Sequence, residues 1–479
     1  MLILALATIL TPFLGAVLVA LSPQPVAKHL GRAFAGLSLA CVLGLAAVFA
    51  AAGKPTVERA VISFGDVEIL GFAVDTVSVL VAVAVVAIGL LVAIYSCDYF
   101  SKDNREHADI GRRRFWAFLL VFIGAMAGLV FTSTVIGQLV FFEITGACSW
   151  ALIGYYEKPK PFASALKALI ITHIASLGLY LAAALVFLNT GTFSLGALAG
   201  LPVGLKTVVL LAILVAAWGK SAQLPFHMWL PDAMEAPTPV SAYLHAASMV
   251  KVGVYIFARS LMSAGEVPEI IGWVGSIMAV ATLIYGFVMY LPQADLKRLL
   301  AYSTITQLAY IFLGLSLSVF GSKLAFDGAI AHIFNHAFAK TLFFLIAGAL
   351  SFTAGTRMLP VLRGILAKSP VLGVGFVVAA LAITGVPPFS GFFSKFAIFA
   401  GGFEVGATHP ALMVLTVVAL VESVASFSWF LKWIGRSVVG TPSETMAAAQ
   451  PVPAAMKLVL GILIVMTVVS SFVATAWLG

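Results

Sequence analysis

Long apolar stretches follow one another along the whole chain, and this repetition constrains the fold more than any other feature. A helix that crosses the hydrocarbon core of a membrane needs about 20 mostly apolar residues. Of the 479 residues, 62% are apolar and 10% are charged, whereas soluble domains carry about 25% charged residues. Such a chain has too little polar surface to face water on all sides, so its solvent must be lipid. The sequence therefore predicts an all-α integral membrane protein.

Fourteen stretches satisfy the length rule for a membrane-spanning helix. They lie at 2–22, 31–52, 74–97, 115–132, 134–155, 163–188, 205–224, 239–261, 270–291, 299–318, 325–353, 371–401, 410–436 and 454–477. The first follows Met1 without a preceding charge or a clear cleavage site, so we interpret it as a retained helix and not as a signal peptide. Prolines crowd the segment 225–238, where we expect a broken continuation of the seventh helix or a re-entrant connection.

The distribution of Lys and Arg between the loops predicts the orientation, because basic loops of membrane proteins face the cytoplasm. One side of the predicted topology carries seventeen basic residues: Lys28, Arg32, Lys102, Arg105, Arg112, Arg113, Arg114, Lys158, Lys160, Lys297, Arg298, Arg357, Arg363, Lys368, Lys432, Arg436 and Lys457. The other side carries five: Lys54, Arg59, Lys206, Arg259 and Lys323. We therefore expect both termini to lie outside a bacterial-type inner (cytoplasmic) membrane. This topology accounts for the net charge of +8 without nucleic-acid binding.

Among the ionisable side chains inside the predicted spans we single out eight: Glu143, Lys167, Lys220, Lys251, His332, His336, Lys340 and Lys395. A charged group at membrane depth costs about 2.5–3.5 kcal/mol on insertion scales, so each is a functional-site hypothesis by default. The alternative for a lysine near a helix end is a structural ion pair or a side chain that reaches the interface, and Lys167 fits that description. For the other seven side chains we predict a role in proton transfer.

The spacing of three of these groups supports proton transfer. His332, His336 and Lys340 fall at i, i+4 and i+8, so they lie along one face of the eleventh helix. Such a row of titratable groups is what proton hopping requires. Histidines at i and i+4 also suit zinc, but no carboxylate or cysteine lies nearby in sequence to complete a metal site. We therefore expect no metal at this row.

The remaining motifs argue against an enzyme. The three cysteines, Cys41, Cys97 and Cys148, are far apart and form no CxxC, which argues against an iron–sulfur cluster, a nickel site or a disulfide framework. The chain also contains no GxSxG and no Walker-type loop. We expect no cofactor and no catalytic residue in this chain.

Prolines are expected to interrupt two of the spans. Pro225 removes the hydrogen bond to the carbonyl of Ser221, and the pair Pro387 and Pro388 acts in the same way in the twelfth span. Unwound backbone at membrane depth is tolerated only where protein or a wet cavity satisfies it. Paired interruptions point to inverted repeats and an ion path. We therefore predict two inverted five-helix repeats with discontinuous helices seven and twelve, although Lys220 precedes its proline and Lys395 follows its pair.

This pattern divides the chain into four parts. They are the N-terminal helices 1–3 (1–114), repeat one with helices 4–8 (115–261), repeat two with helices 9–13 (262–436) and the C-terminal helix 14 (437–479).

Burial disfavours the charged form of a lysine and a nearby carboxylate favours it, so a movement of the carboxylate would make the lysine bind or release its proton. A pair of Glu143 with Lys220 is therefore a plausible gate, with the other predicted proton-transfer groups as onward stations.

The chain resembles the antiporter-like subunits of respiratory complex I and of multi-subunit cation/proton antiporters. The resemblance runs through FFEITGACSWALIGYY, AAWGKSAQLPFHMWLPDAMEAPTPVSAYLHAASMVKVGVYIFAR, FNHAFAKTLFFLIAGAL and GVPPFSGFFSK. It implies a fourteen-helix fold of two inverted repeats and proton translocation coupled to redox chemistry in partner subunits. It also implies that Glu143, Lys220 and Lys251 match the family's charged residues of helices five, seven and eight. In the same way, the eleventh-helix row and Lys395 match those of helices eleven and twelve.

Within this family the likeness is nearest to component D of hydrogenase-4, a membrane subunit of formate hydrogenlyase complexes. The implied partners are other membrane subunits and a peripheral nickel–iron hydrogenase and iron–sulfur arm. Two alternatives stay open, namely a non-conducting scaffold of the hydrogenase and a sodium/proton antiporter subunit. Sodium prefers oxygen ligands, and the predicted groups are richer in Lys and His than in carboxylates, which favours protons.

The charge bias generates a test of topology. We expect reporter fusions in the loop that contains Arg112–Arg114 to report a cytoplasmic position, and fusions at both termini to report an external one. An external signal from the Arg112–Arg114 loop would contradict the predicted orientation.

Overall fold

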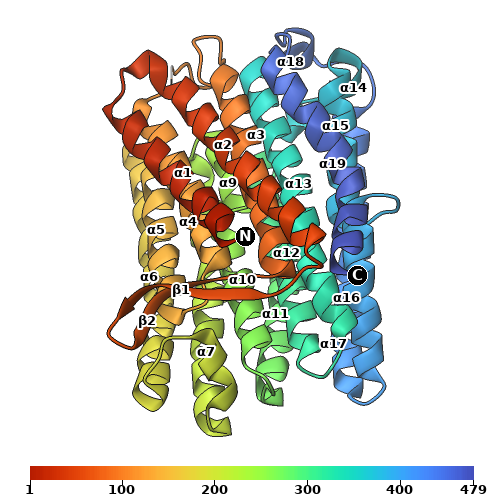
Figure 1. Ribbon diagram of the computed structural model, residues 1–479. Coiled ribbons are helices and arrows are strands. Elements are labelled where there is room, and N and C mark those ends of the chain that lie inside the picture. Colours follow the sequence, from red (N-terminus) through yellow and green to blue (C-terminus); the bar gives the residue numbers. More distant parts are fainter. Residues whose placement is uncertain (110) are drawn as a thin grey trace.

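Tilted helices and one β-hairpin make up the computed structural model, which describes residues 1–109 and 111–479 (Figure 1). Among the described residues, 13 helices are long and apolar enough to cross a membrane. A further crossing is divided between two shorter helices, α15 (Pro370–Thr384) and α16 (Ser390–Gly406). The chain is thus a mostly helical, multi-pass membrane protein whose crossings agree with about fourteen spans.

The N-terminal part forms three spans and the hairpin. Its elements are α1 (Leu2–Leu21), α2 (Gln24–Ala51), β1 (Val57–Phe64), β2 (Val67–Val74) and α3 (Thr76–Tyr99). Helix α2 starts at Gln24 and not at residue 31, because proline is tolerated in the first turn of a helix, where Pro25 stands. The antiparallel strands β1 and β2 occupy a stretch for which we predict only a loop, and they lie across the helices in Figure 1.

The next part contains two interrupted crossings. Its elements are α4 (Arg113–Phe131), α5 (Val135–Ile153), α6 (Pro159–Thr190), η1 (Leu195–Gly200), α7 (Val203–Lys220), α8 (Trp229–Asp232), η2 (Ala233–Glu235), α9 (Thr238–Ala246) and α10 (Met249–Ser263). The predicted break after Lys220 is present, and the carbonyl of Ser221 accepts a hydrogen bond of 2.9 Å from the Gln223 side chain. A second break between α9 and α10 falls inside the predicted span 239–261. There the Ser248 hydroxyl bonds back to the carbonyl of Tyr243 and competes with the helix.

The C-terminal part contains the divided crossing. Its elements are α11 (Glu269–Tyr290), α12 (Leu296–Ser318), α13 (Lys323–Ala354), η3 (Leu359–Val361), α14 (Ile365–Lys368), α15, α16, α17 (Pro410–Trp433), the π-helical turn η4 (Ile434–Val438), α18 (Glu444–Ala447) and α19 (Ala454–Leu478). The predicted span 371–401 is interrupted between α15 and α16, where Pro387 and Pro388 stand. Helices α7 and α15 enter their crossings from opposite ends of the bundle, as inverted repeats require (Figure 1).

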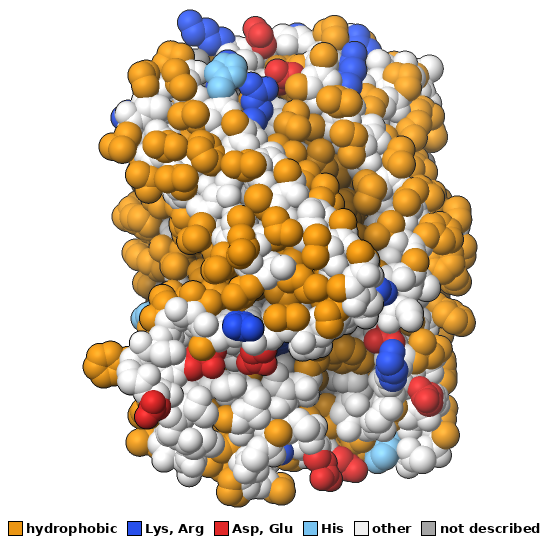
Figure 2. Space-filling model, in the orientation of Figure 1, with side chains coloured by type: hydrophobic (Ala, Val, Ile, Leu, Met, Phe, Trp, Pro, Cys, Tyr) orange, Lys and Arg blue, Asp and Glu red, His pale blue; other side chains and the backbone are white. Residues whose placement is uncertain are grey.

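Ion pairs join the loops at one end of the bundle. Arg112 and Arg114 both contact Glu157, and hydrogen bonding from Arg112 holds the pKa of the Glu157 carboxyl below its usual range. Arg357 bridges Glu106 and Asp295 in the same region. These loops belong to the more basic side of the predicted topology. Figure 2 shows basic side chains at this upper end and a broad band of apolar side chains below it.

Three basic residues that we predict in loops are instead buried in helices. Arg259 lies in α10 and forms an ion pair with Asp75, which also caps the first turn of α3. Lys206 of α7 donates hydrogen bonds to three backbone carbonyls, and Lys297 of α12 donates to two. Their long side chains reach acceptors inside the protein, so these helices begin or end further out than the sequence indicates. Glu58 of β1 is exposed at the surface of the protein, where partial burial raises the pKa of its carboxyl.

The Arg259–Asp75 pair gives a test of stability. Asp75→Asn keeps a good N-cap residue but leaves the buried guanidinium without a counter-charge. We expect the free energy of unfolding to fall by about 3–5 kcal/mol, measured as a lower thermal midpoint in detergent. Because removing both charges of a buried pair is often close to neutral, the double variant Asp75→Asn/Arg259→Met should recover much of the loss. A single variant as stable as the wild type would contradict this role.

Candidate functional site

Lys220 ends α7 at the first break and is fully buried. Its ammonium donates a 2.9 Å hydrogen bond to the carbonyl of Phe142 and lies 4.1 Å from the centre of the Phe142 ring. The break places this lysine at a helix C-terminus, where free carbonyls and the helix dipole favour a positive charge. Phe142 directly precedes Glu143 in α5, so the lysine lies next to the predicted carboxylate along that helix.

Glu143 has its nearest partners on α6 and not on α7. Its carboxylate accepts a 2.5 Å hydrogen bond from the Ser176 hydroxyl and lies 3.2 Å from Nδ1 of His173. Among the described residues no direct ion pair joins Glu143 to Lys220, although the charge of Glu143 acts on that lysine. The structure therefore places Glu143 near Lys220, as predicted, but the direct contacts of Glu143 are with His173 and Ser176. The sequence-based prediction missed His173, although an ionisable side chain inside the predicted span 163–188 indicates a functional site in the same way as Glu143 does.

The eleventh-helix row is present on α13. The rings of His332 and His336 have centroids 5.9 Å apart. His332 Nδ1 lies 2.8 Å from the Ser394 hydroxyl, and its Nε2 lies 3.1 Å from the side-chain oxygen of Gln307. Lys340 donates hydrogen bonds to the carbonyl of Leu300 and, at 2.9 Å, to the Ser303 hydroxyl. All three bases are buried, so the row runs through the protein interior.

Two further bases, Lys251 of α10 and His245 of α9, lie near His336 of the row. Lys251, Lys340, His332 and His245 all lie close enough for their charges to act on His336. Lys251 Nζ and both ring nitrogens of His245 and His336 are buried and have no hydrogen-bond partner within the part of the chain that the structure describes. The break between α9 and α10 separates His245 from Lys251. The sequence-based prediction missed His245, although it falls within the predicted span 239–261.

Lys395 lies in α16, beyond the proline break between α15 and α16, and is also buried. Its ammonium is 3.1 Å from the Ser423 hydroxyl and 4.1 Å from the centre of the Tyr310 ring. Ser423 in turn donates a 3.0 Å hydrogen bond to the carbonyl of Thr384. This carbonyl lies four residues before Pro388, which has no N–H to bind it. Ser394, the residue before Lys395, contacts His332, so the row on α13 leads to this lysine.

Glu422 of α17 is the carboxylate whose charge acts on Lys395. It is 6% exposed and accepts hydrogen bonds from the hydroxyls of Tyr310 and, at 3.3 Å, Tyr290. The sequence-based prediction missed Glu422, although a lone glutamate in the predicted span 410–436 carries the same signal as Glu143. Each end of the row thus combines a buried lysine at a helix break, an aromatic ring and a carboxylate.

Lys167 does not belong to this arrangement. It forms an ion pair of 2.7 Å with Asp232 of α8, which agrees with the structural alternative for this lysine.

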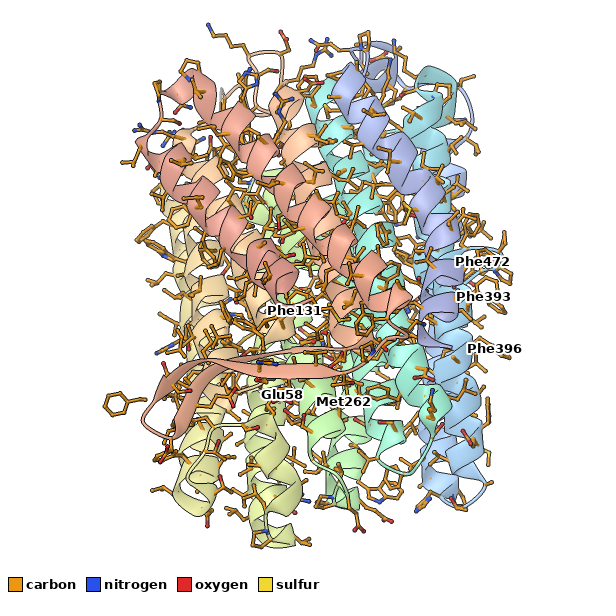
Figure 3. All side chains as sticks on the ribbon, in the orientation of Figure 1. Glu58, Phe131, Met262, Phe393, Phe396 and Phe472 are labelled. Atoms are coloured by element: carbon orange, nitrogen blue, oxygen red, sulfur yellow. The ribbon has the colours of Figure 1, made fainter. Side chains whose placement is uncertain are left out.

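A cavity of about 240 Å³ opens beside Lys395 between α16 and α17. Phe396 lines the cavity, and Figure 3 shows its ring at the outer edge of the bundle. The second lysine is therefore close to the lateral surface of the chain.

Comparisons with known proteins connect this geometry to a family. Residues 132–421 match the family model described as NADH:quinone oxidoreductase/Mrp antiporter, TM. Residues 62–115 match the model of the N-terminus of chain 5 of NADH-ubiquinone oxidoreductase (complex I). The first match contains all seven predicted proton-transfer residues.

Two curated relatives and one solved structure resemble the chain. A Na(+)/H(+) antiporter subunit of Alkalihalophilus pseudofirmus is 35% identical over 390 residues, which are 77% of this chain and 48% of that protein. A Na(+)/H(+) antiporter subunit of Staphylococcus aureus is 34% identical over 82% of this chain and 51% of its own length. A chain of the Mrp complex from Dietzia sp. DQ12-45-1b superimposes with a TM-score of 0.82 at 30% identity, over 97% of this chain and 50% of that one. The chain spans about half the length of the relatives that it matches.

The cluster around His336 gives a test that does not depend on transport. Buried nitrogen atoms without a partner are strongly disfavoured, and ordered water commonly satisfies such groups. We expect a high-resolution cryo-EM map to contain ordered water molecules between Lys251, His245 and His336. A map in which these side chains bond directly to one another, with no water between them, would contradict a hydrated connection.

Proposed function

The chain belongs to the NADH:quinone oxidoreductase/Mrp antiporter membrane family, and we propose that it moves protons as one subunit of a multi-subunit cation/proton antiporter. The observation that carries this proposal is the run of buried bases between two lysine–carboxylate sites. Ser221, next to Lys220, donates a 2.7 Å hydrogen bond to the carbonyl of Val250, next to Lys251. His332 of the α13 row contacts Ser394, next to Lys395. The matched relatives are named as sodium/proton antiporter subunits, which favours an antiporter over the nickel–iron hydrogenase complex expected from sequence.

Proton transfer would begin and end at the two lysine sites. Burial disfavours a charged ammonium and a nearby carboxylate favours it, so a small movement between the two changes proton occupancy. At one site the carboxylate is Glu143, which His173 and Ser176 hold on α6. At the other it is Glu422, held by Tyr290 and Tyr310. We propose that the negative charge of Glu143 acts on the ammonium of Lys220 through space, without a direct salt bridge.

The central bases would connect the two lysine sites. Lys251, His245 and His336 have buried nitrogens without partners among the described residues, so water between them would complete a hydrogen-bonded chain. His332 contacts Ser394, the residue before Lys395. These contacts support a path along the mid-plane of the bundle, from the first repeat to the second.

The ion that uses this path would be the proton. Sodium is bound by oxygen ligands, whereas the path is lined mostly by lysine and histidine nitrogens. The relatives are about twice as long as this chain and belong to complexes with several subunits. We propose that sodium exchange, where it occurs, depends on other parts of the complex, and that other membrane subunits are the partners of this chain.

Two finer predictions remain proposals, namely the four-part division of the chain and the location of both termini outside the inner membrane. The peripheral nickel–iron hydrogenase and iron–sulfur arm expected from the sequence belongs to the competing assembly. None of the relatives named above is a hydrogenase subunit. Co-purification of the native complex would distinguish an antiporter assembly from a hydrogenase assembly by the subunits that it recovers.

Lys220→Arg tests whether the first lysine must exchange its proton. A guanidinium does not release its proton at accessible pH, so we expect redox- or gradient-driven proton movement in sealed vesicles to be abolished. Lys220→Ala should also abolish it, because the alanine carries no titratable group. Proton movement is followed with a pH-sensitive dye, after complex assembly has been confirmed by native electrophoresis.

The matched control is Lys206→Arg, which replaces a second buried lysine of the same helix with the same residue. Lys206 binds backbone carbonyls away from the row, so this variant should keep proton movement. An assembled Lys220→Arg variant with normal proton movement would refute the lysine exchange. Normal movement in both Lys220 variants would favour the non-conducting scaffold. Repeating the assay with and without sodium identifies the exchanged cation.

A further inference from the structure

A basic pocket lies where α17 ends at the end of the bundle that carries the basic loops. Its volume is about 460 Å³, and it is lined by Leu359, Pro360, Arg363, Trp433, Gly435 and Arg436. None of these lining residues is acidic. Within residues 1–109 and 111–479, neither Arg363 nor Arg436 forms an ion pair. The pocket therefore presents two positive charges that the protein does not neutralise by direct contact.

Trp433 adds a buried donor to the same pocket. Its side chain is only 6% exposed, and its Nε1–H has no hydrogen-bond partner among the residues that the structure describes. Trp429 packs edge-on against it, with ring centroids 6.4 Å apart. The ammonium of Lys432 lies 3.8 Å from the centre of the Trp429 ring. A buried indole N–H without an acceptor is disfavoured, so the pocket lacks an acceptor as well as a negative charge.

The backbone leaves this pocket accessible. The π-helical turn η4 follows α17 directly, and such turns are frequent at functional sites. A Cβ atom added at Gly435 would meet no other atom within 4 Å. Arg363 and Arg436 are both exposed, so their guanidinium groups are free to bind an anion at the end of the helix.

An apolar stripe leads from this pocket along α17 toward the membrane interior. Its exposed members recur at intervals of three and four residues, which places them on one face of the helix. They are Val417, Val421, Val424, Leu431 and Gly435, with the small hydroxyl of Ser428 as the one polar group on this face. At 1.5 Å per residue, Gly435 and Val424 are about 16 Å apart. This length corresponds to about half of a hydrocarbon core 30 Å thick, which is one lipid leaflet. Val424 also lines the cavity beside Lys395.

We propose that this pocket binds the phosphate headgroup of an anionic phospholipid, with an acyl chain lying on the stripe of α17. Arginine guanidinium groups bind phosphate oxygens with paired, charge-assisted hydrogen bonds. The indole N–H of Trp433 supplies a neutral donor to the same group, as tryptophans do at the membrane interface. Basic pockets between helices on the cytoplasmic side are suited to acidic lipid headgroups. A polar pocket continuous with an apolar stripe of leaflet length matches an amphiphile better than a free phosphate ion.

A photoreactive phosphatidylglycerol tests this proposal on the full chain in its complex, reconstituted in nanodiscs of phosphatidylcholine. We expect labelling of the peptide around Trp433 and competition by unlabelled phosphatidylglycerol. Each arginine contributes about a fivefold change in binding at a membrane surface, so Arg363→Gln/Arg436→Gln should require about 30-fold more lipid for the same labelling. The control Lys28→Gln/Lys457→Gln removes two basic residues of the same predicted side outside the pocket and should label like the wild type. Trp433→Phe should also weaken labelling, because it keeps the packing and removes the donor.

Several results would overturn the proposal. Equal labelling by photoreactive phosphatidylcholine would show that the pocket does not select an anionic headgroup. Inorganic phosphate that competes as well as the lipid would assign the pocket to a soluble anion. A cross-link from this face to a neighbouring subunit in place of lipid would show that protein covers the stripe. Because Arg363 and Arg436 are exposed, their replacement should leave the thermal midpoint in detergent unchanged, which separates lost binding from lost folding.

Discussion

The cost of holding charges and backbone polar groups away from water governs this structure. A bilayer offers no hydrogen-bond partners, so every such group must find one inside the protein. The buried Arg259 meets Asp75, and Lys206 meets three carbonyls. These contacts have direct structural explanations. Lys251, His245 and His336 are different, because their side-chain nitrogens have no partner among the described residues, and the proposed proton path starts from that difference.

The two breaks at prolines, after α7 and between α15 and α16, show how the same requirement builds a site. Proline frees backbone carbonyls at membrane depth, and polar side chains then have to approach the break. Ser423 does so by donating to the carbonyl of Thr384 while its hydroxyl contacts Lys395. At the first break, Gln223 binds the carbonyl of Ser221 beside Lys220. Each interruption therefore provides the polar surroundings in which a lysine can be buried.

The similarity of the two lysine sites has a functional consequence. Each lysine lies near an aromatic ring and within the field of a carboxylate, and the α13 row contacts the second site through His332 and Ser394. In the proposed path, comparable sites at both ends would pass a proton in either direction, so its direction would depend on partner subunits. The cavity beside Lys395 and the stripe on α17 show that one end lies near the lateral surface. Lipid or a neighbouring protein at that surface would share the surroundings of the proton path.

The sequence alone predicted the membrane class, most spans, both proline breaks and the row of His332, His336 and Lys340. These features depend on local composition and helical period, which are readable within one segment. It did not predict the hairpin, the break at Ser248, or the positions of His173 and Glu422 beside the two lysine sites. Glu422 acquires its meaning only when α17 packs beside Tyr310 of α12, more than a hundred positions earlier in the chain. Such contacts join segments that are distant in sequence, and no local pattern records which helix faces meet. The tertiary structure alone therefore decided which carboxylate accompanies Lys395, whereas the sequence had already indicated Glu143 for Lys220.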